Sequence, residues 1–494
     1  MSKFKLSFLL VSILLLTGCS NDVKTVENTQ QELNSEEVDE TFTIPTPLEN
    51  AIAGTESDDA ALSKNDSDGE TIEAIYLGVK GYGTVTRSSM SAFQYRFFVD
   101  GEEFLYQIDN GLQTEDGSFS YPIQNILKEG YIYRLKIEND TVLYAKEVAL
   151  SQCGTIEAVT GNGIIVDGTE YPAYSIWNIT RQAGGAKVEE IIPQIGNTVF
   201  ITEDASSQRA YRMQTAEPYS PPASGIPGYK TLKNFLATAL MPVGTTLYIY
   251  GGAWDWQDTG SSVQATEIGL PEEWVTFFQM QDAGYTYKVA DPSLSYYPFG
   301  GWNEYYFAGA DCSGYVGWVL YNTMHDKDGE DGYVVYAADY ARNLSERGWG
   351  SYSGSIAVPN GSAETAIKPG DIMSMSGHVW ISLGTCSDGS VVIAHSTTSP
   401  SRSGQPGGGV QLSALGYSEN CEAYSLAKQY MTQYYPAWSE RYSVILRQPS
   451  DYLSTAGNDT GLFSWDISGS VNGLSDPEGY QNMTPQEILA GLFE

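Results

Sequence analysis

The pattern of hydrophobic and polar positions differs between the two halves of this 494-residue chain. From residue 71 to residue 215, short runs of Val, Ile, Tyr and Phe alternate with turns rich in Gly, Asp and Asn, which is typical of β-strands. We interpret this stretch as two small all-β barrel domains, residues 71–150 and residues 151–215. Helix-like and strand-like runs then mix, so residues 241–447 are expected to form an α+β domain.

Two strand-like runs of the second half each carry a histidine. The run from His378 to Gly384 follows a Gly-Asp turn, and the run from Val391 to His395 follows the turn at residues 387–390. Two such runs joined by a short Asp-Gly loop are typical of a β-hairpin. His378 and His395 would then lie on neighbouring strands, where one imidazole can hydrogen-bond the other.

A cysteine stands where a helix is expected to begin, in the segment Asp311-Cys312-Ser313-Gly314. The helix dipole favours a thiolate at that position by roughly 0.3–1 kcal/mol. Such a setting can lower a cysteine pKa from ~8.5 and make the sulfur a nucleophile. The alternative is a packing cysteine, because Cys312 also shares one helical face with several hydrophobic residues.

A nucleophilic cysteine requires a base, and the base requires an orienting group. The chain contains three histidines. His325 is excluded as the base, because a continuous helix would place it ~20 Å beyond Cys312. We therefore predict Cys312 as the nucleophile, His378 as the base and His395 as the group that orients it.

These residues carry a resemblance to a known family. Asp311 to Gly314, the Gly370-Asp371 turn, His378-Val379 and the later His395 resemble the motifs of NlpC-type cell-wall cysteine peptidases. The resemblance covers residues 241–447 and implies a papain-like catalytic domain without a cofactor or metal. It implies hydrolysis of amide bonds in the peptide stems of peptidoglycan, with Asp311 and Ser313 in contact with the substrate.

A tyrosine motif that precedes the nucleophile in this family has two candidates. Tyr248 begins Tyr-x-Tyr-Gly-Gly, and Tyr297 begins a similar segment closer to Cys312. The flanking pattern favours Tyr248 as the substrate-binding residue, and the spacing favours Tyr297. If Tyr248 is the residue of this motif, residues 261–300 are an aromatic-rich insertion. This insertion either shapes substrate subsites or forms ordinary core. The two β domains resemble SH3-like modules, which either hold wall polymer or act as spacers.

The N-terminal segment predicts an anchored, exported protein. Residues 1–19 have a basic start and a short apolar run, and they end in Leu-Thr-Gly-Cys, which resembles a bacterial lipobox with lipid-modified Cys19. Residues 20–70 hold fourteen acidic residues and two lysines, so we expect a disordered acidic tether. This predicts a lipoprotein on the extracytoplasmic face of the cell membrane. An ordinary secretory signal is the alternative.

Charge and cysteine content restrict the partners. The formal net charge of −35 argues against nucleic-acid binding, which requires clustered Lys and Arg. No cysteine–histidine cluster has the spacing of a zinc site. Outside the cytoplasm Cys386 and Cys421 could form a disulfide, although burial as free thiols is the default expectation.

The remaining segments flank the catalytic domain. Residues 216–240 are interpreted as a proline-rich linker and a lead-in helix, and residues 448–494 as a C-terminal tail without chemistry. Within the tail, Thr484 and Glu487 predict the capped start of a helix. Two other functions remain open at this point. One is an N-acetylmuramoyl-L-alanine amidase or acyltransferase with the same residues, and the other is a non-catalytic wall-binding lipoprotein.

Overall fold

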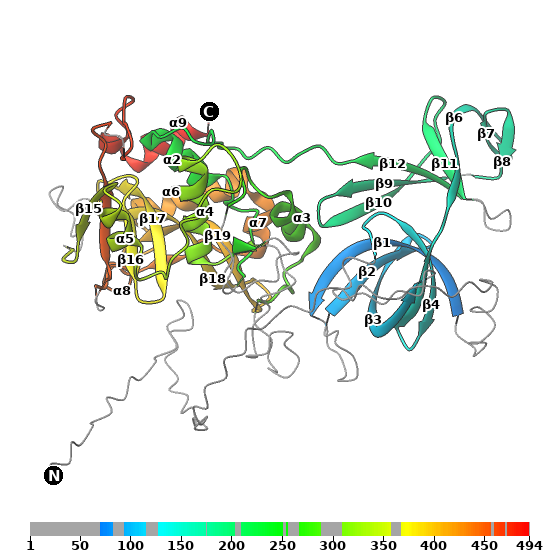
Figure 1. The fold of residues 1–494 in the computed structure, drawn as a ribbon, viewed down its shortest axis with the longest axis horizontal. Coiled ribbons are helices and arrows are strands. Elements are labelled where there is room, and N and C mark those ends of the chain that lie inside the picture. Colours follow the sequence, from blue (N-terminus) through cyan, green and yellow to red (C-terminus); the bar gives the residue numbers. More distant parts are fainter. Residues whose placement is uncertain are drawn as a thin grey trace, which may run out of the picture.

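The computed structural model describes most of the chain beyond residue 69. The described residues are 70–82, 93–114, 127–173, 175–202, 209–249, 253–254, 266–287, 309–356, 367–455, 459–469 and 472–493. They form a β lobe, residues 70–215, and an α+β lobe, residues 216–493 (Figure 1). The predicted signal peptide with Cys19, and the tether up to residue 69, lie outside the described residues.

A closed five-stranded barrel forms the first part of the β lobe, as predicted for residues 71–150. Its strand order is β1-β2-β3-β5-β4. The strands are β1 (Glu70–Tyr82), β2 (Phe93–Val99), β3 (Glu102–Thr114), β4 (Ile132–Glu138) and β5 (Thr141–Glu147). Alternate positions turn inward, so Phe97, Leu135 and Val142 are completely buried at its centre.

The second β domain is a seven-stranded sheet, so the prediction of a second barrel over residues 151–215 is wrong. In the described residues the order is β10-β9-β12-β11-β6-β7-β8, and β10 and β8 remain unpaired edges. The strands are β6 (Leu150–Thr160), β7 (Gly163–Val166), β8 (Thr169–Tyr171), β9 (Ile176–Gln182), β10 (Gly185–Ile191), β11 (Thr198–Thr202) and β12 (Ala210–Thr215). Ile179 and Ala186 pack against Ile75 and Leu77 of the barrel. The β9–β10 hairpin therefore buries its apolar side on its neighbour domain.

A second seven-stranded sheet is the centre of the α+β lobe. Its order is β15-β21-β16-β17-β18-β19-β20. These strands are β15 (Gly350–Ser353), β16 (Ile372–Met375), β17 (His378–Thr385), β18 (Val391–Pro400), β19 (Pro406–Leu415), β20 (Leu446–Arg447) and β21 (Gly461–Trp465). Strands β17 and β18 pair antiparallel, which confirms the predicted hairpin between His378 and His395. Two short strands, β13 (Ala253–Trp254) and β14 (Gly309–Ala310), form a separate ribbon.

Helices cover this sheet. They are α2 (Leu232–Leu240), α3 (Glu272–Met280), α4 (Cys312–Met324), α5 (Tyr340–Glu346), α6 (Glu422–Tyr434), α7 (Pro436–Arg441), α8 (Pro449–Tyr452), α9 (Pro485–Leu492) and the 3-10 turn η4 (Tyr480–Asn482). Helix α4 packs against β17 and β18, and α2 packs against α4. Because α2 is buried along almost its whole length, it belongs to the core of this lobe rather than to a linker.

The C-terminal segment is an integral part of the α+β lobe, so the predicted domain end at residue 447 is wrong. Strand β21 lies between β15 and β16 in the sheet. Phe463 of β21 is completely buried, and the Trp465 ring packs edge-on against Phe235 of α2 at 5.2 Å. The capped helix predicted at Thr484 is confirmed as α9, with both hydrogen bonds of the capping box to Glu487 present.

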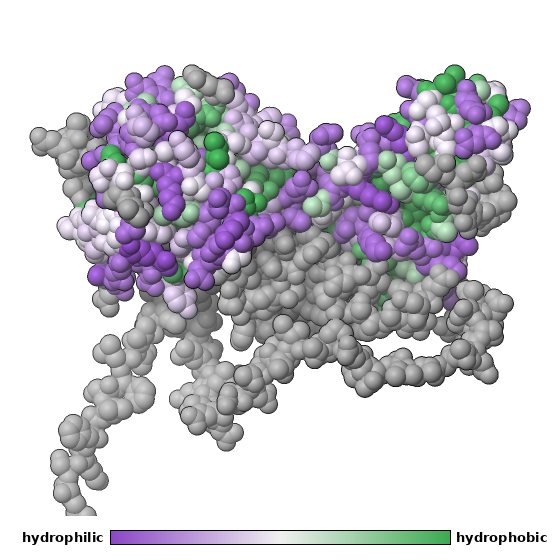
Figure 2. Space-filling view, turned by 45° about the horizontal axis from the view of Figure 1, so that its top comes forward, coloured by the Kyte–Doolittle hydropathy of each residue, from purple (hydrophilic) through white to green (hydrophobic). Residues whose placement is uncertain are grey.

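Helix α3 joins the two lobes. Trp274, Phe277 and Phe278 are buried, so this part of the aromatic insertion is core. At the end of α3, Met280 contacts β1 and β10, and Asp282 pairs with Lys80 of the barrel at 3.0 Å. In the face shown in Figure 2, hydrophobic groups gather on the β lobe, whereas the α+β lobe is mostly hydrophilic or neutral.

Candidate active site

The predicted nucleophile is the first residue of α4. Asp311 is the N-cap, and its Oδ1 accepts hydrogen bonds from the Gly314 N–H at 2.7 Å and the Ser313 hydroxyl at 2.8 Å. Cys312 is 6% exposed, so the residue is largely shielded from water. This is the placement at which a helix dipole favours a thiolate.

The thiol lies next to the strand that carries His378. The Cys312 Sγ is 4.0 Å from the carbonyl oxygen of Gly377, the residue immediately before His378. Gly377 closes the turn between β16 and β17 with a φ of +79°, a conformation that favours glycine. The tight turn therefore brings the start of β17 to the N-terminus of α4.

The two imidazoles form the hydrogen bond that the hairpin predicted. His378 Nε2 lies 2.9 Å from His395 Nδ1, and His395 Nε2 lies 2.9 Å from the Ser413 hydroxyl on β19. His395 is completely buried and His378 is 8% exposed. Because His395 occupies Nε2 of His378, Nδ1 is the ring nitrogen that remains for a thiol proton.

Both imidazoles are neutral at physiological pH. Burial, together with the positive charge of Arg447, lowers the pKa of His378 to about 3. Burial, His378 and Arg447 hold the pKa of His395 well below its usual range. A neutral His378 has a lone pair that can accept a proton, but a pKa of about 3 makes the resting ring a weak base. A thiolate that forms beside the ring would raise this pKa.

We expect these pKa shifts to appear in the stability of the fold. The pKa of each histidine is lower in the folded than in the unfolded chain. Their contribution is therefore fully present above pH ~6.5 and is lost as the pH falls toward about 3. Each excluded proton adds up to about 1.4 kcal/mol per pH unit to the slope of the unfolding free energy. Urea denaturation at several pH values between 4 and 7 measures the free energy of unfolding. This free energy should depend less steeply on pH in the double variant His378→Gln/His395→Gln than in the wild type. An unchanged slope would contradict the buried neutral pair.

A tyrosine from the C-terminal segment packs on both imidazoles. The Tyr452 ring centroid is 5.2 Å from that of His378 and 5.9 Å from that of His395, both edge-on. Trp380 Nε1 donates to the Tyr452 carbonyl oxygen at 3.2 Å, and the Arg447 guanidinium lies 5.8 Å above the Tyr452 ring. Tyr452 keeps the histidine pair away from water and limits its rotation. Sequence reasoning missed it because it lies beyond the assumed end of the domain.

Replacing Tyr452 by leucine should loosen the histidine pair and slow reactions of Cys312. We expect alkylation of Cys312 by iodoacetamide at pH 7 to slow by about tenfold or more, because a displaced imidazole no longer meets the thiol proton. Tyr452→Phe keeps the ring and should react at nearly the wild-type rate. Peptide mapping by mass spectrometry measures both rates. Equal rates for the leucine and phenylalanine variants would show that the ring does not position the histidines.

The predicted substrate residues Asp311 and Ser313 flank Cys312 in the chain, and the backbone of Tyr248 lies on a neighbouring segment. Asp311 and Ser313 are hydrogen-bonded to each other in the first turn of α4. The Tyr248 N–H donates to the Gly408 carbonyl oxygen of β19 at 2.9 Å. The next residue, Ile249, bonds the carbonyl oxygen of Ala310, which precedes Asp311 by one position. The backbone at Tyr248 therefore runs beside the segment that leads into the nucleophile. The competing Tyr297 lies outside the described residues.

The other cysteines of this lobe are free thiols. Cys386 and Cys421 are both buried and carry no disulfide, so the pairing considered from the sequence is not formed here. Cys386, Asp388 and Glu422 could together offer three ligand atoms to a metal ion. Their carboxylates already have structural roles, because Asp388 accepts from the Glu422 N–H at 2.8 Å and Glu422 accepts from the Ser387 hydroxyl at 2.7 Å. These hydrogen bonds fasten the β17–β18 turn to the start of α6.

Among the helices that the structure describes, none combines the length and the apolar character needed to cross a membrane. Comparison with known proteins adds no relative: no family model, curated protein or solved structure matches this chain.

Proposed function

We propose that this protein is a cysteine peptidase that hydrolyses amide bonds in the peptide stems of peptidoglycan. One observation carries the proposal. A cysteine at the start of a buried helix adjoins a strand whose first residue, His378, is hydrogen-bonded to a second histidine. A thiol, a neutral base and an orienting group are the parts that nucleophilic amide cleavage requires. The resemblance of Asp311 to Gly314 and of His378-Val379 to NlpC-type motifs directs the proposal to cell-wall peptides.

In the proposed reaction, Cys312 Sγ attacks the carbonyl carbon of the scissile amide while His378 Nδ1 takes the thiol proton. The N-terminus of α4 stabilises the oxyanion, because its backbone N–H groups and dipole point toward the developing negative charge. His378 returns the proton to the leaving amine, and the C–N bond breaks to give a thioester. Water, deprotonated by His378, then hydrolyses the thioester and restores the thiol. His395 holds the His378 ring in orientation throughout.

The location of the protein is part of the proposal. A lipid on Cys19 would hold the chain on the outer face of the membrane, and the acidic segment 20–70 would extend the enzyme toward the wall. The many like charges of this segment favour an extended chain. Its proposed partners are therefore the membrane and the stem peptides of peptidoglycan, without nucleic acid.

Product analysis tests the proposed reaction. The chain without residues 1–19 is incubated with purified muropeptides, and the products are identified by mass spectrometry. We expect a gain of one water and cleavage inside the stem peptide. Cleavage between the sugar and the first stem residue would instead identify an N-acetylmuramoyl-L-alanine amidase. Intact muropeptides, at an enzyme concentration where Cys312 still reacts with iodoacetamide, would contradict the proposal.

A further inference from the structure

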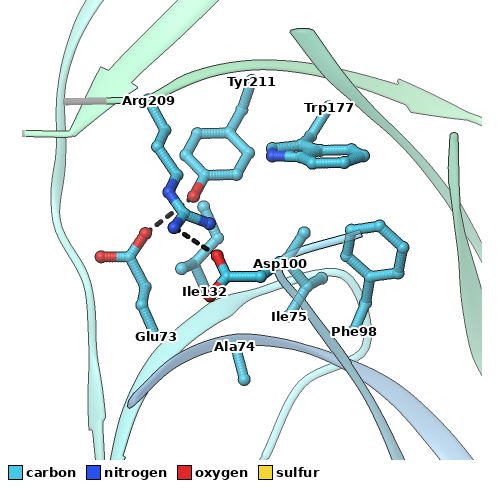
Figure 3. Close-up of a pocket in the computed structure, with 9 residues that line it drawn as sticks. All are labelled: Glu73, Ala74, Ile75, Phe98, Asp100, Ile132, Trp177, Arg209 and Tyr211. Carbon is cyan, nitrogen blue, oxygen red and sulfur yellow. Dashed lines mark hydrogen bonds and ion pairs between the residues drawn. The ribbon is translucent and has the colours of Figure 1, made fainter. Parts of the chain in front are cut away.

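The small pocket between the two domains of the β lobe is filled by its own side chains. It is bounded by β1, the turn after β2, and strands β9 and β12, and it leaves room for about one water molecule. Figure 3 shows the Arg209 side chain between Glu73 and Asp100, and its guanidinium pairs with Asp100. This pocket is therefore a packed contact between the barrel and the sheet.

A chain of three hydrogen-bonded side chains crosses the central sheet of the α+β lobe. His378 on β17 lies 2.9 Å from His395 on β18, and His395 Nε2 lies 2.9 Å from the hydroxyl of Ser413 on β19. Ser413 stands opposite Ile393, two positions from His395, so Ser413 and His395 are diagonal cross-strand neighbours. The pairing of the strands therefore places the hydroxyl at the second imidazole.

Ser413 is a polar residue in an apolar part of β19. It is completely buried, and so are the apolar residues of the strand around it, Val410, Leu412, Ala414 and Leu415. A buried hydroxyl is costly unless it is hydrogen-bonded, and alanine would fill nearly the same volume. The bond to His395 therefore explains this serine better than packing does.

The chain of hydrogen bonds can run in two directions. A neutral imidazole has one N–H donor and one lone pair, whereas a hydroxyl can donate or accept. If Ser413 accepts from His395 Nε2, then His395 Nδ1 accepts from His378 Nε2, and His378 Nδ1 keeps a lone pair. If Ser413 donates instead, His378 accepts at Nε2 and carries its proton on Nδ1. In that second direction His378 has no nitrogen left for a thiol proton.

We propose that Ser413 is a positioning residue that sets the first direction, with both imidazoles protonated on Nε2. The proposal rests on the proposed peptidase function, which uses His378 Nδ1 as the base. In that reaction one proton moves from Cys312 Sγ to His378 Nδ1. The imidazolium still donates from Nε2 to His395, so every bond of the chain is kept and no other proton has to move. Without an acceptor at position 413, the His395 Nε2 proton would be a buried, unsatisfied donor, which favours the second direction.

Nitrogen NMR of the imidazoles tests the position of each proton. The full-length chain, in a non-ionic detergent at pH 7, is labelled with ¹⁵N in its three histidines. We expect His378 and His395 each to show a protonated Nε2 and an unprotonated Nδ1. The variant His325→Gln removes the signals of the third histidine and so completes the assignment. A protonated Nδ1 on His378 in the wild type would overturn the proposal.

The variant Ser413→Ala removes the acceptor. We expect signals of a protonated Nδ1 to appear for His395, because its Nε2 proton has lost its partner. Ser374→Ala is the matched control, because Ser374 is also a completely buried serine of this sheet and accepts from the Ala341 N–H at 2.7 Å. It should leave both imidazoles as in the wild type. Proton positions that are identical in Ser413→Ala and the wild type contradict the role of Ser413.

Kinetics of muropeptide cleavage provide the second measurement. Ser413→Ala should lower kcat by about tenfold and leave KM unchanged, because fewer molecules keep a lone pair on His378 Nδ1. Ser413→Thr keeps the hydroxyl and should restore kcat, whereas Ser374→Ala should retain it. If the added methyl group of Ser413→Thr prevents folding, the comparison of the two alanine variants decides. Equal kcat values for Ser413→Ala and the wild type would reject the positioning role.

The two measurements separate this proposal from the peptidase function. If the wild type leaves muropeptides intact, but its proton positions are as expected and change in Ser413→Ala, the peptidase function fails and Ser413 still sets the direction of the chain. If the wild type cleaves muropeptides and the proton positions do not change in Ser413→Ala, the role of Ser413 fails and the peptidase function stands.

Discussion

Replacing Cys312 by alanine should reduce muropeptide cleavage by at least about 10⁴-fold, because no other group on α4 can form the thioester. The fold should survive the change. Cys312 lies at the first position of α4, and the helix keeps its cap at Asp311. We therefore expect cleavage to disappear while thermal unfolding shifts by no more than about 3 °C.

Cys386→Ala is the matched control, because Cys386 is also a buried free thiol of the same lobe. Burial raises the pKa of Cys386 to about 12, so this sulfur stays protonated and should neither cleave substrate nor react with iodoacetamide at pH 7. The control variant should keep full activity. If Cys312→Ala and Cys386→Ala cleave muropeptides at the same rate, the peptidase proposal fails, and a wall-binding role without catalysis becomes the better explanation.

Local signals in the sequence were sufficient to predict the helix and the hairpin that carry the candidate site. Asp311 caps α4 through its own side chain, so the helix start is visible in four consecutive residues. The β17–β18 hairpin is set by a short Asp-Gly turn between two hydrophobic runs. Both signals involve neighbours in the chain, and the pairing of His378 with His395 follows from the hairpin.

Long-range packing was not visible in the sequence. The barrel and the second β domain have similar strand patterns, yet only the first closes, because β9 and β10 bury their apolar side on the barrel. Tyr452 lies 57 positions beyond His395, and no periodicity links them. Tyr452 ends α8, the short helix after β20, and its carbonyl oxygen accepts a hydrogen bond from Trp380 of β17, a contact between segments 72 positions apart.

The order of strands in the sheet makes the segment after residue 447 essential for folding. Phe463→Ala should lower the free energy of unfolding of the α+β lobe by about 3–5 kcal/mol, because it opens a cavity in the core beside β21, the strand between β15 and β16. Phe463 is completely buried, and its ring packs edge-on against Trp465 at 5.1 Å. Burial raises the pKa of the nearby Asp371 to about 7. The Asp371 carboxylate accepts hydrogen bonds from the Lys368 N–H and from Ser464, which lies on β21 beside Phe463. A displaced β21 would therefore also weaken the hydrogen bond between Ser464 and Asp371.

Phe104→Ala serves as the comparison, because Phe104 lies on β3 of the barrel and is 38% exposed. Its effect should be about 1 kcal/mol or less, since little apolar surface is transferred to water. Differential scanning calorimetry measures both variants, and iodoacetamide labelling of Cys312 reports on the site. If the segment after residue 447 were a separate tail, Phe463→Ala would unfold at the wild-type temperature and label like wild type. We expect instead a midpoint lower by roughly 10 °C, because β21 completes the sheet that carries His378.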